Sequence, residues 1–146
     1  WVVNKKIVNE KIKKRGNQSL DIPYDQVRRV TGGQRIGGAI FEVDLDNTHP
    51  IGYGYNKKIA VFRRGDTFFD LSKSSAANVA RYTNNPLLSG YISEEKLMEI
   101  KNTASILAKR QGSGRVVLFA DNPSFRAFWY GTNGLLLNAV FFGRSF

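Results

Sequence analysis

The side chains best suited to chemistry in this sequence are its one histidine, His49, and a late aspartate, Asp121. Both follow segments that we expect to be strands, which is where α/β folds place functional groups. If the fold brought them to one substrate, they could act as the general acid and base of a hydrolase. Each also has a structural interpretation, which we favour. His49 would shape a turn, and Asp121 would pair with Arg126 to fix the next one.

Several other kinds of chemistry are excluded by residue type. The chain has no Cys, which removes disulfides, thiolate nucleophiles and Cys-ligated zinc. A single His cannot build a His-rich metal site, and no Gly-x-Ser-x-Gly elbow is present. The glycine pairs do not form a Gly-x-Gly-x-x-Gly or Gly-Lys-Ser/Thr phosphate loop. We therefore expect no metal or other cofactor in this segment.

Two tyrosines, Tyr53 and Tyr55, occupy the loop after His49 and are candidates for contact with a ligand or partner. With His49, Asp121 and Arg126 they make up our set of ligand or interface candidates. Further aromatic residues gather in residues 124–142 and could form a stacking platform. Because they alternate with Leu and Ala rather than Lys and Arg, we interpret them as core.

The charge of the 146-residue chain is concentrated at its beginning. It carries 22 Lys and Arg against 12 Asp and Glu, a formal net charge of +10. Residues 1–35 supply nine of the basic residues and three of the acidic ones, which is more than half of the excess. A basic segment can bind nucleic acid, and this stays open as an alternative function. We favour a solvated helix face of a larger protein.

Hydrophobic periodicity predicts the secondary structure. We expect strands over 36–45, 59–63, 103–110 and 115–121, and helices over 1–14, 93–101 and the mostly buried end of the chain within 124–142. This mixture predicts one α/β domain spanning 1–146. No apolar run reaches the ~18 residues of a membrane helix, and no signal peptide is recognisable. Because the sequence begins at Trp, we expect a piece of a longer protein.

Three sequence phrases carry a resemblance to a known family. They are GGAIFEVD (37–44) leading to THPIGYG (48–54), then NPLLSGY (85–91), then LFADNPSFRAFWYGTN (118–133). In this order and spacing they resemble the C-terminal glutamine-amidotransferase-like domain of bacterial zinc carboxypeptidase-like proteins of the carboxypeptidase A superfamily. The resemblance runs from about residue 25 to residue 143.

The resemblance implies a partial flavodoxin-like domain of the class I glutamine amidotransferase type, with a mixed sheet flanked by helices. It also implies a metallopeptidase parent, periplasmic or secreted, with zinc held only by an upstream peptidase domain that would be this chain's partner. An amidotransferase triad needs a Cys, and this chain has none. We therefore expect a non-catalytic accessory domain that is structural or recognises a peptide or cell-wall ligand. We expect no membrane span, and nucleic acid is not the favoured partner.

Overall fold

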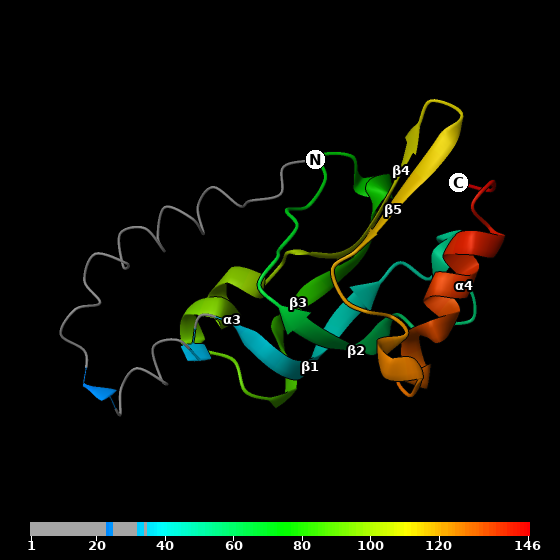
Figure 1. Cartoon of the computed structure of the whole chain (residues 1–146). Coiled ribbons are helices and arrows are strands. Elements are labelled where there is room, and N and C mark those ends of the chain that lie inside the picture. Colours follow the sequence, from blue (N-terminus) through cyan, green and yellow to red (C-terminus); the bar gives the residue numbers. More distant parts are fainter. Residues whose placement is uncertain (1–22, 25–31, 34) are drawn as a thin grey trace.

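The computed structural model describes residues 23, 24, 32, 33 and 35–146. A curled five-stranded sheet of order β2-β1-β3-β4-β5 forms its centre, and all four pairings are antiparallel (Figure 1). The strands are β1 (Ile36–Leu45), β2 (Lys58–Gly65), β3 (Asn78–Gly90), β4 (Ala104–Gln111) and β5 (Gly114–Phe119). Two α-helices, α3 (Glu94–Ile100) and α4 (Asn133–Phe141), and four short 3-10 helices, η2 (Pro50–Gly52), η3 (Ser75–Ala77), η4 (Phe125–Ala127) and η5 (Tyr130–Thr132), complete the described part.

Strand β1 shows how the sequence pattern builds the core. Phe41 and Val43 are completely buried, whereas Glu42 and Asp44, which follow them in turn, point to the other face. This alternation is that of a strand with one face on a core. The expected strand over 36–45 is confirmed at both ends, and the strands and helix predicted over 59–63, 93–101, 103–110 and 115–121 are present with small shifts of their bounds.

Strand β3 was not predicted, because its polar residues and Pro86 do not resemble a strand. Its pairing with β1 is irregular. Phe41 lies opposite Leu87, but Val43 lies opposite Tyr82, so residues 83–86 bulge out of the ladder. Further along, Gly90 has a φ of +97°, and a Cβ there would lie 2.9 Å from Ala39. Only glycine allows β1 and β3 to approach so closely.

The C-terminal helix is shorter and more exposed than the sequence predicted. Residues 125–132 form the 3-10 helices η4 and η5, and α4 begins only at Asn133. Leu135 is the one buried residue of α4, whereas Leu137, Val140 and Phe141 are 67%, 77% and 82% exposed. The prediction of a buried helix is wrong because α4 lies at the side of the molecule and packs by one face only (Figure 1).

The expected α/β class is confirmed in its broad form, as strands and helices packed in one fold. The expected mixed sheet is not what the described strands form, since every pairing is antiparallel. The reason lies in the connections. Parallel neighbours need a crossover of about a dozen residues or more, so the two-residue turn between β4 and β5 makes that pair antiparallel.

Two sequence-based expectations fall mainly on residues that are not described. The predicted helix over 1–14 lies outside the described residues, and of the basic first quarter only residues 23, 24, 32, 33 and 35 are described. Within the described part, no helix has the length and apolar character needed to cross a membrane.

Candidate functional site

A buried polar cluster centred on Arg63 joins three strands of the sheet. Arg63 lies on β2 two residues after Val61, so both side chains point into the core, and Arg63 is only 1% exposed. Its Nη1 donates to the hydroxyl of Tyr82 on β3 at 2.8 Å and lies 3.4 Å from Oδ1 of Asp121. The guanidinium also stacks over the ring of Phe68, with its carbon 4.8 Å from the ring centroid.

Asp121 is held by donors on all sides. Besides Arg63, the Tyr82 hydroxyl donates to its Oδ1 and the Ser105 hydroxyl donates to its Oδ2, the latter at 2.6 Å. Arg63 completes the cluster by donating to the backbone carbonyls of Ala120, at 3.1 Å, and Thr67. Buried charges persist in proteins when they are paired and hydrogen-bonded in this way.

Burial sets the protonation of this cluster. It raises the pKa of the Asp121 carboxyl, while the positive charge of Arg63 and the hydroxyl donors oppose that rise. Burial likewise raises the pKa of Tyr82 well above 10, so its hydroxyl remains protonated and continues to donate at neutral pH. The Arg63 and Asp121 side chains are only 1% and 7% exposed, so the cluster is largely shielded from solvent. The cluster therefore holds the sheet together.

His49 has a structural role that accounts for both its position and its tautomer. Its Nδ1 accepts a hydrogen bond from the backbone N–H of Ile51 at 3.2 Å and so caps η2. Its ring lies 4.7 Å from that of Phe146. Burial lowers the pKa of His49, and the negative charge of Asp46 partly opposes this. His49 has no contact in common with Asp121, so the geometry lends no support to their acting as an acid/base pair.

The two tyrosine candidates lie beside α4. Tyr53 is 69% exposed, and its ring lies 5.7 Å from that of Phe142. Tyr55 is partly buried, and its hydroxyl occupies the space that a side chain at position 134 would need, 2.6 Å from an ideal Cβ on Gly134. Asn138 joins the loop to the helix by donating to the carbonyls of Ile51 and Tyr53 at 3.0 and 2.8 Å.

Arg126 does not pair with Asp121, so that prediction is wrong. Arg126 is exposed and its guanidinium carbon lies 5.4 Å from the centroid of the Phe125 ring, whereas the cation beside Asp121 is Arg63. The backbone of Arg126 adopts a φ of +50°, in the left-handed region. The candidates thus divide into His49, Tyr53 and Tyr55 near α4, Asp121 inside the fold, and Arg126 at the surface.

Sequence reasoning missed Arg63, Tyr82 and Ser105. A signal for Arg63 was available, because the alternation of β2 places it on the same face as Val61. Tyr82 lies on the strand that was not recognised. The interpretation of the late aromatic residues as core was wrong for Phe128, Tyr130 and Phe141, which are 57%, 76% and 82% exposed.

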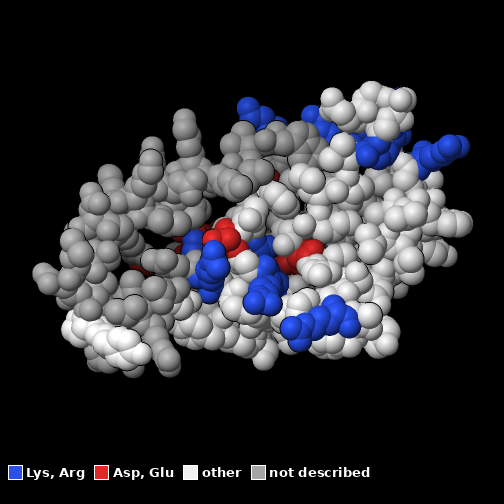
Figure 2. Space-filling model, viewed as in Figure 1, with Lys and Arg blue, Asp and Glu red and all other residues white. Residues whose placement is uncertain are grey.

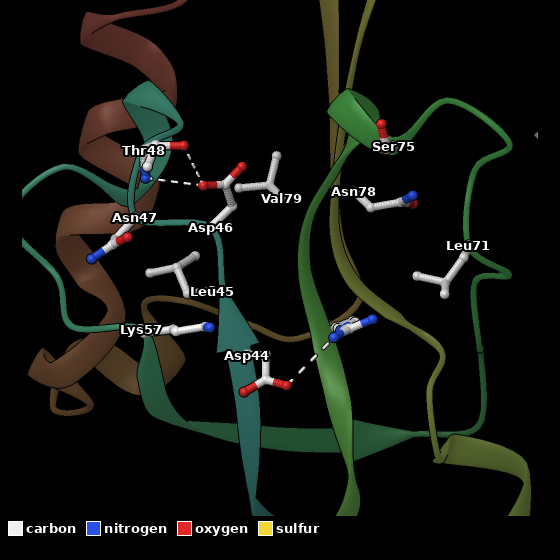
Figure 3. A pocket seen from close by; sticks show the side chains of 11 residues that line it. Asp44, Leu45, Asp46, Asn47, Thr48, Lys57, Leu71, Ser75, Asn78 and Val79 are labelled. Carbon is white, nitrogen blue, oxygen red and sulfur yellow. Dashed lines mark hydrogen bonds and ion pairs between the residues drawn. The ribbon is translucent and has the colours of Figure 1, made fainter.

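An open cavity of about 450 Å³ lies between the end of β1 and the start of β3 (Figure 3). Both signs of charge line it. Nε of Arg81 lies 3.9 Å from Oδ2 of Asp44, and Lys57 also lines the cavity. The backbone N–H and hydroxyl of Thr48 donate to Oδ1 of Asp46 at 3.0 and 2.6 Å. The hydroxyl bond is the main cause of the lowered pKa of Asp46.

The charges around this cavity suit a small polar ligand that carries both an amine and a carboxylate. Figure 2 shows basic and acidic side chains side by side near the centre of the visible face. Within the residues that the structure describes, no three His, Cys, Asp or Glu side chains gather in a way that could hold a metal ion. Comparison of the chain with models of known protein families, with curated proteins and with solved structures finds no match in any of the three.

Removing one partner of the buried pair should destabilise the protein strongly. We expect Asp121→Ala to cost about 3–5 kcal/mol in the free energy of unfolding, because it leaves the Arg63 charge buried without a counter-charge. Arg63→Met combined with Asp121→Leu should cost less than D121A alone. Urea denaturation measures all three proteins. Asp70→Ala, at an exposed position, is the control, and an equal loss in D121A and D70A would contradict a structural role.

The stability of the loop at His49 should depend on pH. The lowered pKa means that the folded state holds a proton at His49 less tightly than the unfolded chain does. The stability that the neutral His49 ring contributes is therefore fully present above its pKa in the unfolded chain, about 6.5. This stability is lost as pH falls through the pKa of His49 in the folded state. His49→Asn keeps a cap without a titrating ring. Between pH 7 and pH 5, we expect the urea midpoint to fall further in the wild type than in H49N. Parallel curves would disprove this.

Proposed function

We propose that this chain is a non-catalytic accessory domain of a zinc carboxypeptidase-like metallopeptidase, and that it docks on the peptidase domain through the outer face of α4. The observation that carries this proposal is the exposed apolar surface of that helix. The three sequence phrases support the proposed metallopeptidase parent. The same resemblance leads us to propose a periplasmic or secreted location, zinc in the upstream domain and the partial flavodoxin-like class.

The outer face of α4 has the character of a protein interface. Leu137 and Phe141 are one turn apart and lie on the same face as Val140, and all three are at least 67% exposed. Tyr130 and Phe128 add exposed aromatic surface nearby in the chain. Contiguous apolar surface of this kind on a folded domain marks a site of association. Aromatic and large aliphatic side chains also dominate the binding energy of interfaces.

The groups best suited to catalysis support a non-catalytic role. Asp121 is enclosed with all its oxygens engaged, and His49 uses Nδ1 to cap η2. The hydroxyls beside Asp121, those of Ser105 and Tyr82, are themselves fully buried and donate to its carboxylate. Measurable peptide or ester hydrolysis by the purified chain, lost in H49N, would contradict this part of the proposal and favour the hydrolase alternative.

The docking proposal is tested first by the reading frame upstream of Trp1, where we expect zinc-ligand residues of the carboxypeptidase type. In the full protein, α4 should be protected from hydrogen exchange. Leu137→Asp with Phe141→Asp should remove that protection and weaken docking of separately expressed domains at least tenfold, because each buried side chain contributes about 1.5–3 kcal/mol. The matched control is Met98→Asp with Leu88→Asp, at residues 68% and 54% exposed. Equal effects of the two pairs, or an upstream frame without zinc ligands, would overturn the proposal.

A second role, recognition of a short peptide such as a cell-wall peptide, is favoured by the cavity in Figure 3. Lys57 and Arg81 offer cations for a terminal carboxylate, and Asp44 and Asp46 offer carboxylates for a terminal amine. A volume of about 450 Å³ holds two or three small residues. Docking through α4 leaves this cavity free, so the two roles are compatible.

Titration with trialanine, followed by the backbone amide signals, tests the cavity. We expect shifts confined to the segments 44–48 and 75–81, and at least fivefold weaker binding by Lys57→Met, which removes a charge but keeps the length of the side chain. Lys101→Met is the control outside the cavity. Shifts scattered over the whole protein, or equal affinity of the two variants, would rule out this ligand site.

A further inference from the structure

The β4–β5 hairpin projects from the body of the molecule as an arm (Figure 1). Gln111 lies opposite Gly114, so Gly112 and Ser113 form a two-residue turn. Gly112 has a φ of +61° at the first central position, as a type II′ turn requires. This turn matches the twist of the strands, so the arm is well formed to its tip.

The tip of the arm carries three cations and no counter-charge. They are Lys109, Arg110 and Arg115, and residues 105–120 contain no Asp or Glu. Arg110 lies directly opposite Arg115, an arrangement of like charges that destabilises a sheet. The bonds formed by the two guanidinium groups go to the neighbouring carbonyls of Gly112 and Gly114. Across the described part of the chain, no ion pair reaches any of the three cations.

The charge pattern of this end of the molecule is visible in Figure 2. Lys and Arg are seen around the hairpin end, at the upper right, without Asp or Glu beside them. The two arginines that face each other across β4 and β5 repel, so this pair is unfavourable for the fold by itself. An anionic partner turns this repulsion into attraction.

The backbone of β5 offers a second kind of contact. It is the last strand of the sheet, so one side of it has no neighbour among the described strands. The pair that closes a two-residue turn exchanges hydrogen bonds, and such pairs alternate along a hairpin with pairs that do not. Arg115 and Val117 fall in the alternate positions, so their N–H and C=O groups point away from β4. Ala120 falls in the hydrogen-bonded positions, and its backbone N–H accordingly donates to the carbonyl of Ser105 on β4 at 2.8 Å.

We propose that the free edge of β5 binds an extended acidic segment of a partner protein, which adds to the sheet as a further strand. A residue of that strand opposite Arg115 would have its side chain on the same face as Arg115 and Arg110. The Cβ of an acidic residue there would lie about 5 Å from the Cβ of Arg115, which places its carboxylate within reach of both guanidinium groups. A second acidic residue on the other face would meet Lys109. This site is separate from the α4 face and does not depend on the accessory-domain proposal.

A polypeptide fits this edge better than a nucleic acid does. Residues 109–118 contain no Phe, Tyr or Trp, and Phe119 at the base of β5 packs against the core, so the tip of the arm provides no platform on which bases could stack. Backbone N–H and C=O groups in strand geometry are matched only by another extended peptide backbone. The three cations then select an acidic sequence, as charged pockets do in other strand-addition sites.

Fluorescence anisotropy with a labelled ten-residue peptide, (Thr-Glu)5, tests the site, and (Thr-Gln)5 is the neutral peptide of the same strand-forming character. We expect (Thr-Glu)5 to bind and (Thr-Gln)5 to bind at least tenfold more weakly. Arg110→Glu with Arg115→Glu should weaken (Thr-Glu)5 binding at least tenfold, and raised salt should weaken it in the wild type. Arg64→Glu with Lys73→Glu, an equal charge change at exposed positions elsewhere, should change affinity less than twofold.

Hydrogen exchange identifies the mode of binding. The amide of Val117 should become protected when (Thr-Glu)5 binds, while that of the exposed residue Asn56 should not. Absence of (Thr-Glu)5 binding, an unchanged affinity of R110E/R115E, or binding without protection of Val117 would overturn the proposal. Tighter binding of a ten-nucleotide oligothymidylate than of (Thr-Glu)5, also lost in R110E/R115E, would overturn it in favour of a nucleic-acid partner.

Discussion

The rest of this fold depends on one buried cation. Arg63 reaches from β2 at one edge of the sheet to Tyr82 in its middle and to Asp121 just beyond β5 at the other edge. A flat sheet would keep those edges far apart, so the contact requires the curl seen in Figure 1. The buried guanidinium has lost its hydration, so the oxygen atoms around it must compensate for that loss. The curl of the sheet, the core and the ion pair are therefore coupled to one another in this fold.

The sequence predicted local structure well where a residue's surroundings repeat along the chain. β1 has apolar residues at every second position, and α3 begins with Ser93 as a cap followed by Glu94 and Glu95. The two-residue turn at Gly112 likewise depends on adjacent residues, because glycine readily adopts the positive φ found there. Such signals depend on a few adjacent positions and need no knowledge of the rest of the fold.

Prediction failed where distant residues decide. β3 has a bulge around Pro86 that makes sense only beside β1, and the partner of Asp121 is 58 residues away rather than five. The candidate site was predicted only in part for the same reason. His49, Tyr53 and Tyr55 were found because they share one loop, whereas Arg63 and Ser105 join Asp121 only through the curl. Apolar composition also could not distinguish a helix buried on all sides from α4, which presents Leu137 and Phe141 to solvent.

The loop that caps η2 belongs to two surfaces at once. At one end Asp46 and Thr48 form a wall of the open cavity, and at the other the carbonyls of Ile51 and Tyr53 are held by Asn138 of α4. Tyr55 packs against Gly134, where a side chain would collide with its hydroxyl, so the loop and α4 are in close contact. A displacement of α4 would therefore act on the loop that forms the cavity wall. If occupancy of one surface changes the affinity of the other, thermodynamics requires that the influence be equal in both directions.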